Sequence, residues 1–425
     1  MPKYVIVGGS AAGIGAVEAI REVDPIGTIS VISEESFSLY SRPMISNYVS
    51  GRVSLDGIKY RDSKFWKNNK VQALIGRKAA SLNFTERYVK LDGGAKIYYE
   101  KLLIATGGKP ILPRIEGVNK DGIFTFTSFA DTDCLMAKIR RGQKAVVVGG
   151  GLIGVAVAEA LVQRGLNVTI VELKDRILNL ILDETASEIV ENVIRKVGVT
   201  ILTGQSVQRI LGKATDNDSI VGGVLLTNGN EIQCDLVVFA IGVIPRTELV
   251  IGTDVKMNRG IIVDKFMRTN VSDVFACGDV AEVYDFLLDE NRLLPLWPIA
   301  YQGGKVAGYN MAGKEADYLD GTFMSSLNYF DLPIISVGIV NPPEDNGYEV
   351  LINHDASKNV YKKLVLRDDV IVGMIFVNGI ERAGILFNLM KNHVNVKKFK
   401  KQLISENPNL AIIPLRLRKK LFMGV

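Results

Sequence analysis

The sequence contains few of the side chains that carry out most acid–base and thiol chemistry. Of its 425 residues, three are cysteine and two are histidine. Cys134, Cys234 and Cys277 lie far apart and form no CxxC or CxxxxC pair, so we expect neither a disulfide framework nor a metal site. His354 and His393 lie late in the chain and outside any motif, and we interpret them as surface or structural residues.

Long apolar runs are also absent. No stretch of about 20 uncharged apolar residues, the length that a membrane helix needs, occurs in the chain. The amino terminus enters strand-like sequence directly, without the basic and apolar leader of a secretory signal. A hydrophobic fraction of 47% and a charged fraction of 23% are typical of a globular protein. We therefore expect a cytoplasmic protein of two or three domains.

Residues 144–172 carry the most informative pattern that is present. A strand is expected at 145–148, a helix from the following turn to about 164, and a second strand at 167–171. Gly149 permits the tight turn, Gly151 lets the backbone approach a pyrophosphate, and Gly154 lets the helix pack on the strand. Glu172 then ends the second strand, where a carboxylate accepts hydrogen bonds from an adenosine ribose. The segment predicts dinucleotide binding.

The chain opens with a similar arrangement. Gly8, Ser10 and Gly13 take the places of the three glycines, and the small side chains of Ser10 and Ala11 keep the approach open. Glu34 follows the second strand. The expected elements are a strand at 3–7, a helix at 14–22 and a strand at 28–32. Two nucleotide folds indicate two dinucleotides, or one dinucleotide and a decayed copy.

Three further strands run into loops of small residues. The strand at 102–105 precedes Thr106 and Gly107, and the strand at 236–241 precedes Gly242. Asp279 follows a third strand and precedes a possible helix. Asp279 either caps that helix or binds sugar or ribityl hydroxyls of a flavin dinucleotide.

Taken in order, these motifs resemble the FAD- and NAD(P)-dependent pyridine-nucleotide oxidoreductases. The motifs are GGSAAG with Glu34, ATGGKP, GGGLIG with Glu172, AIGVIP and FACGD, and they span about residues 1–315. The resemblance implies that FAD contacts Gly8, Ser10, Ala11, Gly13, Glu34, Arg42, Pro43, Thr106, Gly107 and Asp279. It implies that NAD contacts Gly149, Gly151, Leu152, Ile153, Gly154, Glu172 and Gly242.

Residues 295–304 fit the same scheme, with Trp297, Pro298 and Ala300 as further FAD contacts. Pro298 suits the first turn of a helix. The amino end of that helix would point its partial positive charge at the flavin pyrimidine ring and stabilise the anionic reduced form. The alternative is a helix that only packs.

Thiol-dependent members of this family carry a cysteine just after the second strand, and this chain does not. Residues 37–42 read FSLYSR, and Cys277 lies in the FACGD strand, where we interpret it as a packing residue. The YSRPMIS segment resembles the branch that reduces rubredoxin and ferredoxins, and the NADH domain of nitrite reductases. Ala156 and Asn47 replace a glutamate and a lysine that occur near the flavin–nicotinamide contact in that branch.

Residues 320–425 form a third unit. Strands are expected at 326–340 and 360–377, a loop at 341–347, and helices at 383–392 and 396–404. From residue 391 onward, nine basic residues face one acidic residue, a net +8 in a chain of +5, so residues 1–390 carry −3. This tail is a solvated face, a docking surface for an acidic partner, or a nucleic-acid site, and no nucleic-acid motif supports the last. For docking we single out Lys397, Lys398, Lys400 and Lys401.

The predicted fold class is α/β, with two Rossmann-like three-layer domains, the second inserted in the first, and a C-terminal α+β domain with an antiparallel sheet. The predicted boundaries are 1–110 and 241–315 for FAD binding, 111–240 for NAD binding and 320–425 for the last domain. The resemblance implies an FAD-dependent NADH:acceptor oxidoreductase that exchanges electrons with an acidic iron–sulfur carrier. Hydride transfer between the two cofactors needs no catalytic side chain. The alternatives are an NADH oxidase that uses oxygen directly and a non-turnover flavoprotein that senses NADH.

Overall fold

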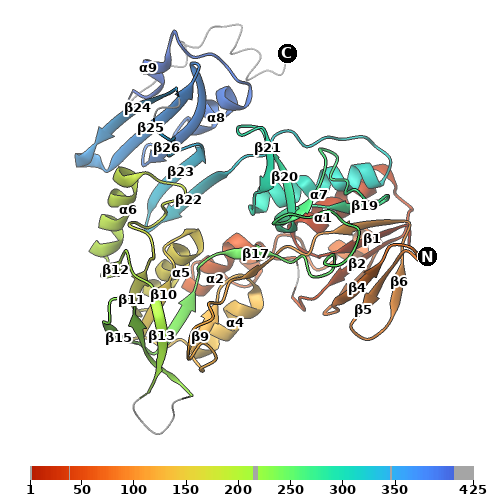
Figure 1. The fold of residues 1–425 in the computed structure, drawn as a ribbon, viewed down its shortest axis with the longest axis horizontal. Coiled ribbons are helices and arrows are strands. Elements are labelled where there is room, and N and C mark those ends of the chain that lie inside the picture. Colours follow the sequence, from red (N-terminus) through yellow and green to blue (C-terminus); the bar gives the residue numbers. More distant parts are fainter. Residues whose placement is uncertain (1, 38, 214–218, 345–346, 406–425) are drawn as a thin grey trace.

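The computed structural model describes residues 2–37, 39–213, 219–344 and 347–405 (Figure 1). Strand β1, which precedes the first glycine turn, is the central strand of a five-stranded parallel sheet with the order β19-β7-β1-β2-β3. In this sheet every residue of strands β1, β2 and β19 is buried, as expected for parallel strands covered on both faces. The bounds are β1 Tyr4–Val7, β2 Ile29–Ser33, β3 Val71–Ile75, β7 Lys101–Ile104 and β19 Val274–Ala276.

Strand β10, which precedes the second glycine turn, lies in the centre of a similar sheet with the order β12-β11-β10-β16-β9. All four of its strand pairings are parallel. Helix α5 (Leu152–Gln163) follows the central strand, and α6 (Glu184–Lys196) precedes the edge strand. The bounds are β9 Ile123–Thr125, β10 Lys144–Val148, β11 Asn167–Val171, β12 Thr200–Leu202 and β16 Leu236–Phe239.

The chain leaves the first sheet, builds the second and then returns. Strand β19 pairs with β7, although the whole second sheet lies between them in the sequence. At the crossing, β8 (Gly108–Pro110) pairs antiparallel with β17 (Val243–Pro245). This return has the topology that an inserted domain requires, while the boundaries at 110, 240 and 315 remain a prediction.

Helices α1 (Ala11–Val23) and α7 (Trp297–Met311) cross closely on the first sheet. Their backbones approach so closely that a Cβ at Gly304 would lie 2.0 Å from the carbonyl oxygen of Ala12. A Cβ at Gly308 would lie 2.5 Å from that of Ala16. The crossing brings the amino end of α7, more than 280 residues further along the chain, to the first glycine turn.

The C-terminal unit is a five-stranded antiparallel sheet with the order β22-β23-β26-β25-β24, drawn in blue above α6 in Figure 1. The two long strands predicted at 326–340 and 360–377 are each a hairpin, and one strand of this sheet was not predicted. The predicted helix at 396–404 is wrong except for its last turn. The bounds are β22 Met324–Tyr329, β23 Leu332–Gly338, β24 Tyr348–Asp355, β25 Val360–Arg367, β26 Val370–Val377, α8 Ala383–Lys391 and α9 Lys400–Leu403.

Smaller elements complete the fold. The helix predicted after Asp279 is also wrong, because a strand, β20, follows there. In the described ranges no helix is long and apolar enough to span a membrane. The remaining bounds are η1 Arg42–Met44, α2 Ile45–Ser50, η2 Asp56–Ile58, α3 Phe65–Asn68, β4 Ala79–Asn83, β5 Tyr88–Leu91, β6 Lys96–Tyr98, α4 Phe129–Lys138, β13 Val207–Gly212, β14 Val221–Leu226, β15 Glu231–Gln233, β18 Ile261–Ile262, η3 Gly278–Val280, β20 Ala281–Asp285, β21 Glu290–Leu293 and η4 Ala356–Lys358.

Candidate functional site

The first glycine turn connects β1 to α1 without room for side chains. Gly8 has φ +127°, and a Cβ there would lie 2.0 Å from the carbonyl oxygen of Ala105. A Cβ at Gly13 would lie 2.0 Å from the carbonyl oxygen of Gly8. Ser10 is the N-cap of α1, but its hydroxyl makes no capping bond. The amino end of α1, which begins at Ala11, therefore keeps N–H groups for an anion.

The first turn meets two segments from the far end of the chain. A Cβ at Gly278 would lie 3.3 Å from the Cβ of Ala12 and 3.5 Å from that of Ala300. The structure thus brings α1, η3 and α7 to one place. Trp297 and Pro298 occupy the first turn of α7, which carries no acidic residue. The positive end of the α7 dipole therefore has no negative side chain beside it in that turn.

Arg42 and Asp279 are half-buried and supply charged groups to the same region. Arg42 pairs with Glu35 and donates to the carbonyl oxygen of Thr127 at 3.4 Å, while its buried Nε has no partner among the described residues. Burial opposes its charge, but Glu35, Tyr40 and Asp279 raise the pKa of Arg42. Burial raises the pKa of Asp279, although Arg42 counteracts this.

These residues fit a flavin dinucleotide. The buried Nε of Arg42 has no acceptor among the described residues, and the half-buried carboxyl of Asp279 interacts electrostatically with Arg42. Asp279 lies within η3 and does not cap a helix, so the capping interpretation of this residue is wrong. Pro43 is the second residue of η1 and continues directly from Arg42.

The acidic residues after β2 have different environments. Glu34 is exposed and pairs with Arg246 at 2.6 Å and with Lys78 at 3.5 Å. Glu35, which the sequence analysis did not identify, pairs with Arg42 and accepts a hydrogen bond from Tyr40 at 2.8 Å. No spacing rule pointed to Glu35, because its partners lie five and seven residues further along an irregular segment.

Thr106 and Gly107, which follow β7, contact Arg246, which follows β17. The hydroxyl of Thr106 donates to the carbonyl oxygen of Arg246 at 2.8 Å. Gly107 has φ +71°, and a Cβ there would meet nothing within 4 Å. The backbone is thus open on this side, as a bound ligand requires. Arg246, also missed, directly follows the AIGVIP motif.

The second glycine turn has the steric design that its sequence predicts. A Cβ at Gly149 (φ +106°) would lie 2.5 Å from the carbonyl oxygen of Ala240, and one at Gly154 would lie 1.9 Å from that of Gly149. A Cβ at Gly151 would meet nothing within 4 Å, so this position faces open space. Leu152 and Ile153 begin α5, whose first turn contains no acid.

Glu172 lies beside this turn at the end of β11. One carboxylate oxygen accepts from the N–H of Gly150 at 2.6 Å and the other from that of Lys174 at 2.7 Å. Each oxygen keeps a lone pair for a ribose hydroxyl. Gly242 has φ +115° and follows β16, so it lies at the same edge of the sheet.

The cysteines do not form a thiol centre. Cys277 is fully buried, and burial raises its pKa. Cys234 is also buried, which raises its pKa to about 12, and only Cys134 on α4 is exposed. In the part of the chain that the structure describes, no three His, Cys, Asp or Glu side chains are grouped as metal ligands.

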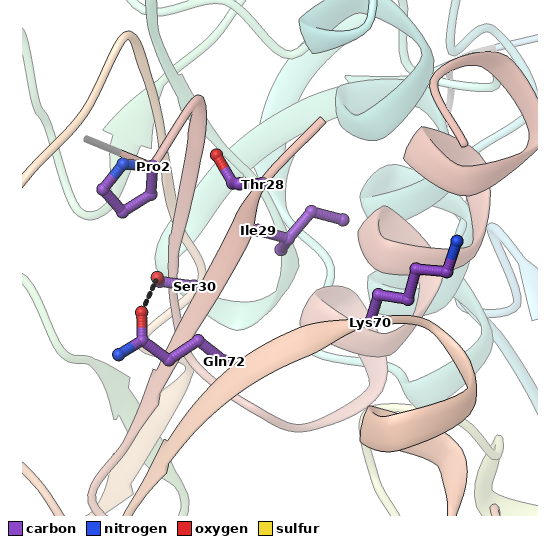
Figure 2. Close-up of a pocket in the computed structure, with 6 residues that line it drawn as sticks. All are labelled: Pro2, Thr28, Ile29, Ser30, Lys70 and Gln72. Carbon is purple, nitrogen blue, oxygen red and sulfur yellow. Dashed lines mark hydrogen bonds between the residues drawn. The ribbon is translucent and has the colours of Figure 1, made fainter. Parts of the chain in front are cut away.

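A surface hollow of about 290 Å³ is lined by Pro2, Thr28, Ile29, Ser30, Lys70 and Gln72 (Figure 2). It lies where β2 and β3 begin, whereas the glycine turns follow the ends of their strands. Ser30 and Gln72 already bond to each other across it at 3.1 Å. The hollow is therefore separate from the candidate cofactor region.

The predicted docking lysines differ in exposure and in ion pairing. Lys400 pairs with Glu349 and, at 2.6 Å, with Asp369, and these bonds raise its pKa. Among the described residues, Lys397, Lys398 and Lys401 are exposed and form no ion pair. Figure 1 shows α9 at the outer end of the C-terminal unit, away from α2 and α7. The basic residues 416, 418, 419 and 420 lie outside the described residues.

Comparison with known proteins gives matches over nearly the whole chain. The pyridine nucleotide-disulphide oxidoreductase family matches residues 2–304, and the rubredoxin NAD+ reductase C-terminal domain matches residues 324–394. The epsilon subunit of NADH-dependent phenylglyoxylate dehydrogenase from Aromatoleum evansii is 31% identical, over 96% of this chain and 95% of the subunit.

Two further similarities concern a longer relative and a solved structure. The nitrite reductase [NAD(P)H] of Bacillus subtilis is 29% identical over 94% of this chain, which spans about half (48%) of that protein. The crystal structure of NADH:rubredoxin oxidoreductase from Clostridium acetobutylicum has a TM-score of 0.75 and 25% identity. That similarity covers 92% of this chain and 96% of the other.

Proposed function

The chain belongs to the pyridine nucleotide-disulphide oxidoreductase family, whose members bind FAD and NAD(H), and on that premise we propose that it transfers electrons from NADH to a small iron–sulfur carrier protein. The observation that carries the proposal is the pairing of two glycine turns of the same steric design, one in each parallel sheet, with no cysteine at the family's thiol position. A disulfide substrate would require that thiol.

The protein's part in the reaction is to bind and to orient. Bound FAD supplies the chemistry, because a flavin takes two electrons from a nicotinamide as hydride and releases them singly. Arg42 and Asp279 hold polar groups of that cofactor, and the positive end of α7 favours negative charge beside it. The N–H groups at the start of α5 bind the nicotinamide dinucleotide, with Glu172 on its ribose.

The carrier is proposed from two observations. Residues 324–394 match a domain of rubredoxin reductases, and one solved structure of similar fold is an NADH:rubredoxin oxidoreductase. We further propose that the carrier is acidic, since the exposed Lys397, Lys398 and Lys401 would attract it. Because α9 lies away from α2 and α7, we expect these lysines to steer the carrier before it binds rather than to form the final contact. A location in the cytoplasm belongs to the same proposal.

Steady-state oxidation of NADH with different acceptors tests this function. The purified holoenzyme is assayed without oxygen on a ferredoxin, a rubredoxin and a small dye, and separately with oxygen alone. We expect fast reduction of an iron–sulfur carrier and slow consumption of oxygen. Oxygen as the best acceptor would establish an NADH oxidase instead, and no turnover with any acceptor would establish a sensor. Mass spectrometry of the heat-released cofactor is expected to find FAD, and finding FMN would contradict the site assignment.

A further inference from the structure

The tip of the first C-terminal hairpin lies against the nucleotide helix α5. The hydroxyl of Tyr329, at the end of β22, donates to the carbonyl oxygen of Leu152 at 2.8 Å. The N–H of Phe330 donates to the carboxylate of Glu159 at 3.0 Å. Leu152 is the first residue of α5 and directly follows Gly151. The hairpin therefore contacts α5 at its first turn and again two turns later.

The hairpin makes these contacts through a turn whose backbone conformation is unfavourable for its residues. Phe330 and Asp331 form a two-residue loop between the paired Tyr329 and Leu332, and they have φ of 50° and 62°. Such turns favour Asn-Gly, and a bulky aromatic residue at positive φ is a conformational outlier. Backbone strain of this kind persists where the surrounding structure requires it and often marks a functional constraint. Here the strained residue presents its N–H to Glu159.

Helix α5 is also held by residues 49–52, at the end of α2 and just after it, which belong to the predicted FAD-binding segment 1–110. Arg52 pairs with Glu159 at 2.8 Å, and Nε of Arg164 donates to the carbonyl oxygen of Val49. Glu159 is 6% exposed, and burial raises its pKa, so its charge depends on these partners. One buried carboxylate thus joins the NAD region, the FAD region and the C-terminal hairpin.

We propose that Tyr329 is a positioning residue for the nicotinamide dinucleotide, and that the C-terminal hairpin completes the NADH site by fixing the first turn of α5. The inference rests on the proposed binding of NADH at the turn from Gly149 to Gly154. The N–H groups of the first helical turn are the ones that face a pyrophosphate. Because backbone groups within one turn move together, holding the carbonyl of Leu152 also holds those N–H groups. The hydroxyl of Tyr329 bonds to the backbone of α5 and takes no part in the chemistry.

The test compares Tyr329→Phe with the control Tyr361→Phe. Tyr361 is also buried and also joins the C-terminal sheet to the NAD region, since its hydroxyl donates to Asp183 at 2.6 Å. Asp183, however, is the N-cap of α6, not part of the glycine turn. Each substitution removes one hydroxyl and keeps the ring. A role in domain attachment alone predicts the same effect for both variants, whereas a positioning role predicts a difference.

Binding of NAD+ to the oxidised holoenzyme is measured by titration calorimetry, which needs no turnover. For Tyr329→Phe we expect about fivefold weaker binding, the effect of one hydrogen bond, together with a raised KM for NADH and an unchanged kcat. For Tyr361→Phe we expect wild-type affinity. FAD content and thermal unfolding are measured for both variants. If Tyr329→Phe does not fold, Glu159→Ala removes the second anchor and is expected to weaken NAD+ binding in the same way.

Equal losses of affinity in the two variants, or wild-type affinity in Tyr329→Phe, would overturn the inference and leave the proposed function intact. A wild-type protein that binds FAD but neither NAD+ nor NADH would instead overturn the proposed function. The two failures are therefore distinguished by the wild-type titration alone.

Discussion

The carboxylate of Glu172 is held between the N–H groups of Gly150 and Lys174, so it cannot easily turn away from a ligand. A 2′-phosphate on the ribose would bring like charges together at this fixed position. We expect kcat/KM for NADH to exceed that for NADPH by about tenfold or more, which corresponds to about 1.4 kcal/mol.

Glu172→Gln keeps the side-chain shape and removes the charge, and it should bring the two kcat/KM values within a few-fold of each other. The control is Glu188→Gln, which removes an equal charge from the exposed face of α6. Equal kcat/KM for both nucleotides in the wild-type enzyme would contradict the role of Glu172.

Arg42 is half-buried and its buried Nε has no partner among the described residues, so removing its side chain should weaken FAD binding. A hydrogen bond to a charged group contributes about 1.5–3 kcal/mol, so Arg42→Gln should raise the dissociation constant for FAD at least tenfold. The ratio of flavin to protein absorbance after dialysis measures this. Arg195→Gln also breaks an Arg–Glu pair, but on α6, and should retain its flavin.

The burial of the thiols predicts their reactivity. Cys134 alone is exposed, and burial raises the pKa of Cys277 and Cys234, which disfavours their thiolates. Iodoacetamide should therefore modify one cysteine of the native protein and leave NADH-to-dye electron transfer nearly unchanged. Mass spectrometry counts the adducts. Complete inactivation of a folded, flavin-containing enzyme would instead reveal a catalytic thiol.

At the scale of elements, the crossing of α1 and α7 depends on the absence of particular Cβ atoms. A Cβ at Gly304 would lie 2.0 Å from the backbone oxygen of Ala12, while one at the neighbouring Gly303 would lie 3.4 Å from Cβ of Cys277. Gly304→Ala should lower the free energy of unfolding by about 1–3 kcal/mol and reduce FAD content, because α7 must shift.

Gly303→Ala is the matched control for this crossing. It adds the same methyl group one residue earlier in the same helix, where the added atom has ordinary contacts and alanine is the better helix former. Urea unfolding of both variants compares them. A Gly304→Ala protein as stable as Gly303→Ala would show that the crossing can relax.

At the scale of the whole molecule, the distribution of charge predicts how a carrier approaches. Replacing Lys397, Lys398 and Lys401 with glutamine should raise the KM for an acidic carrier about threefold or more at low salt. The difference should fade at physiological ionic strength, where charges act over about 8 Å. Reduction of a neutral dye should not change. The KM for the carrier is measured over a series of salt concentrations.

The control for steering replaces Lys64, Lys67 and Lys70, three exposed lysines around α3, with glutamine. It makes the same change of net charge at another place. Equal effects of the two triple variants would mean that only net charge matters. No effect of either would mean that the basic cluster is a solvated face.

The sequence alone determined the features that depend on short-range sterics. The strands, turns and helices around Gly149 and Gly8 were predicted within a few residues, because a glycine turn between a buried strand and a helix is specified by neighbouring residues. The lack of a thiol centre follows in the same way from where the cysteines stand. The parallel sheets could be expected because their strands are continuous apolar runs.

Tertiary structure decided what depends on distant partners. Residues 326–340 read as one strand, since Phe330 is not a usual turn residue and the turn it forms is stabilised by α5. The predicted helix at 396–404 is short because Val396 instead donates its N–H to the carbonyl of Asp369. No spacing in the sequence predicts that Arg42 pairs with Glu35 or that Tyr329 contacts Leu152. Such contacts form only when segments far apart in the chain are packed together, so the sequence identified the two nucleotide turns while the fold decided what holds them in place.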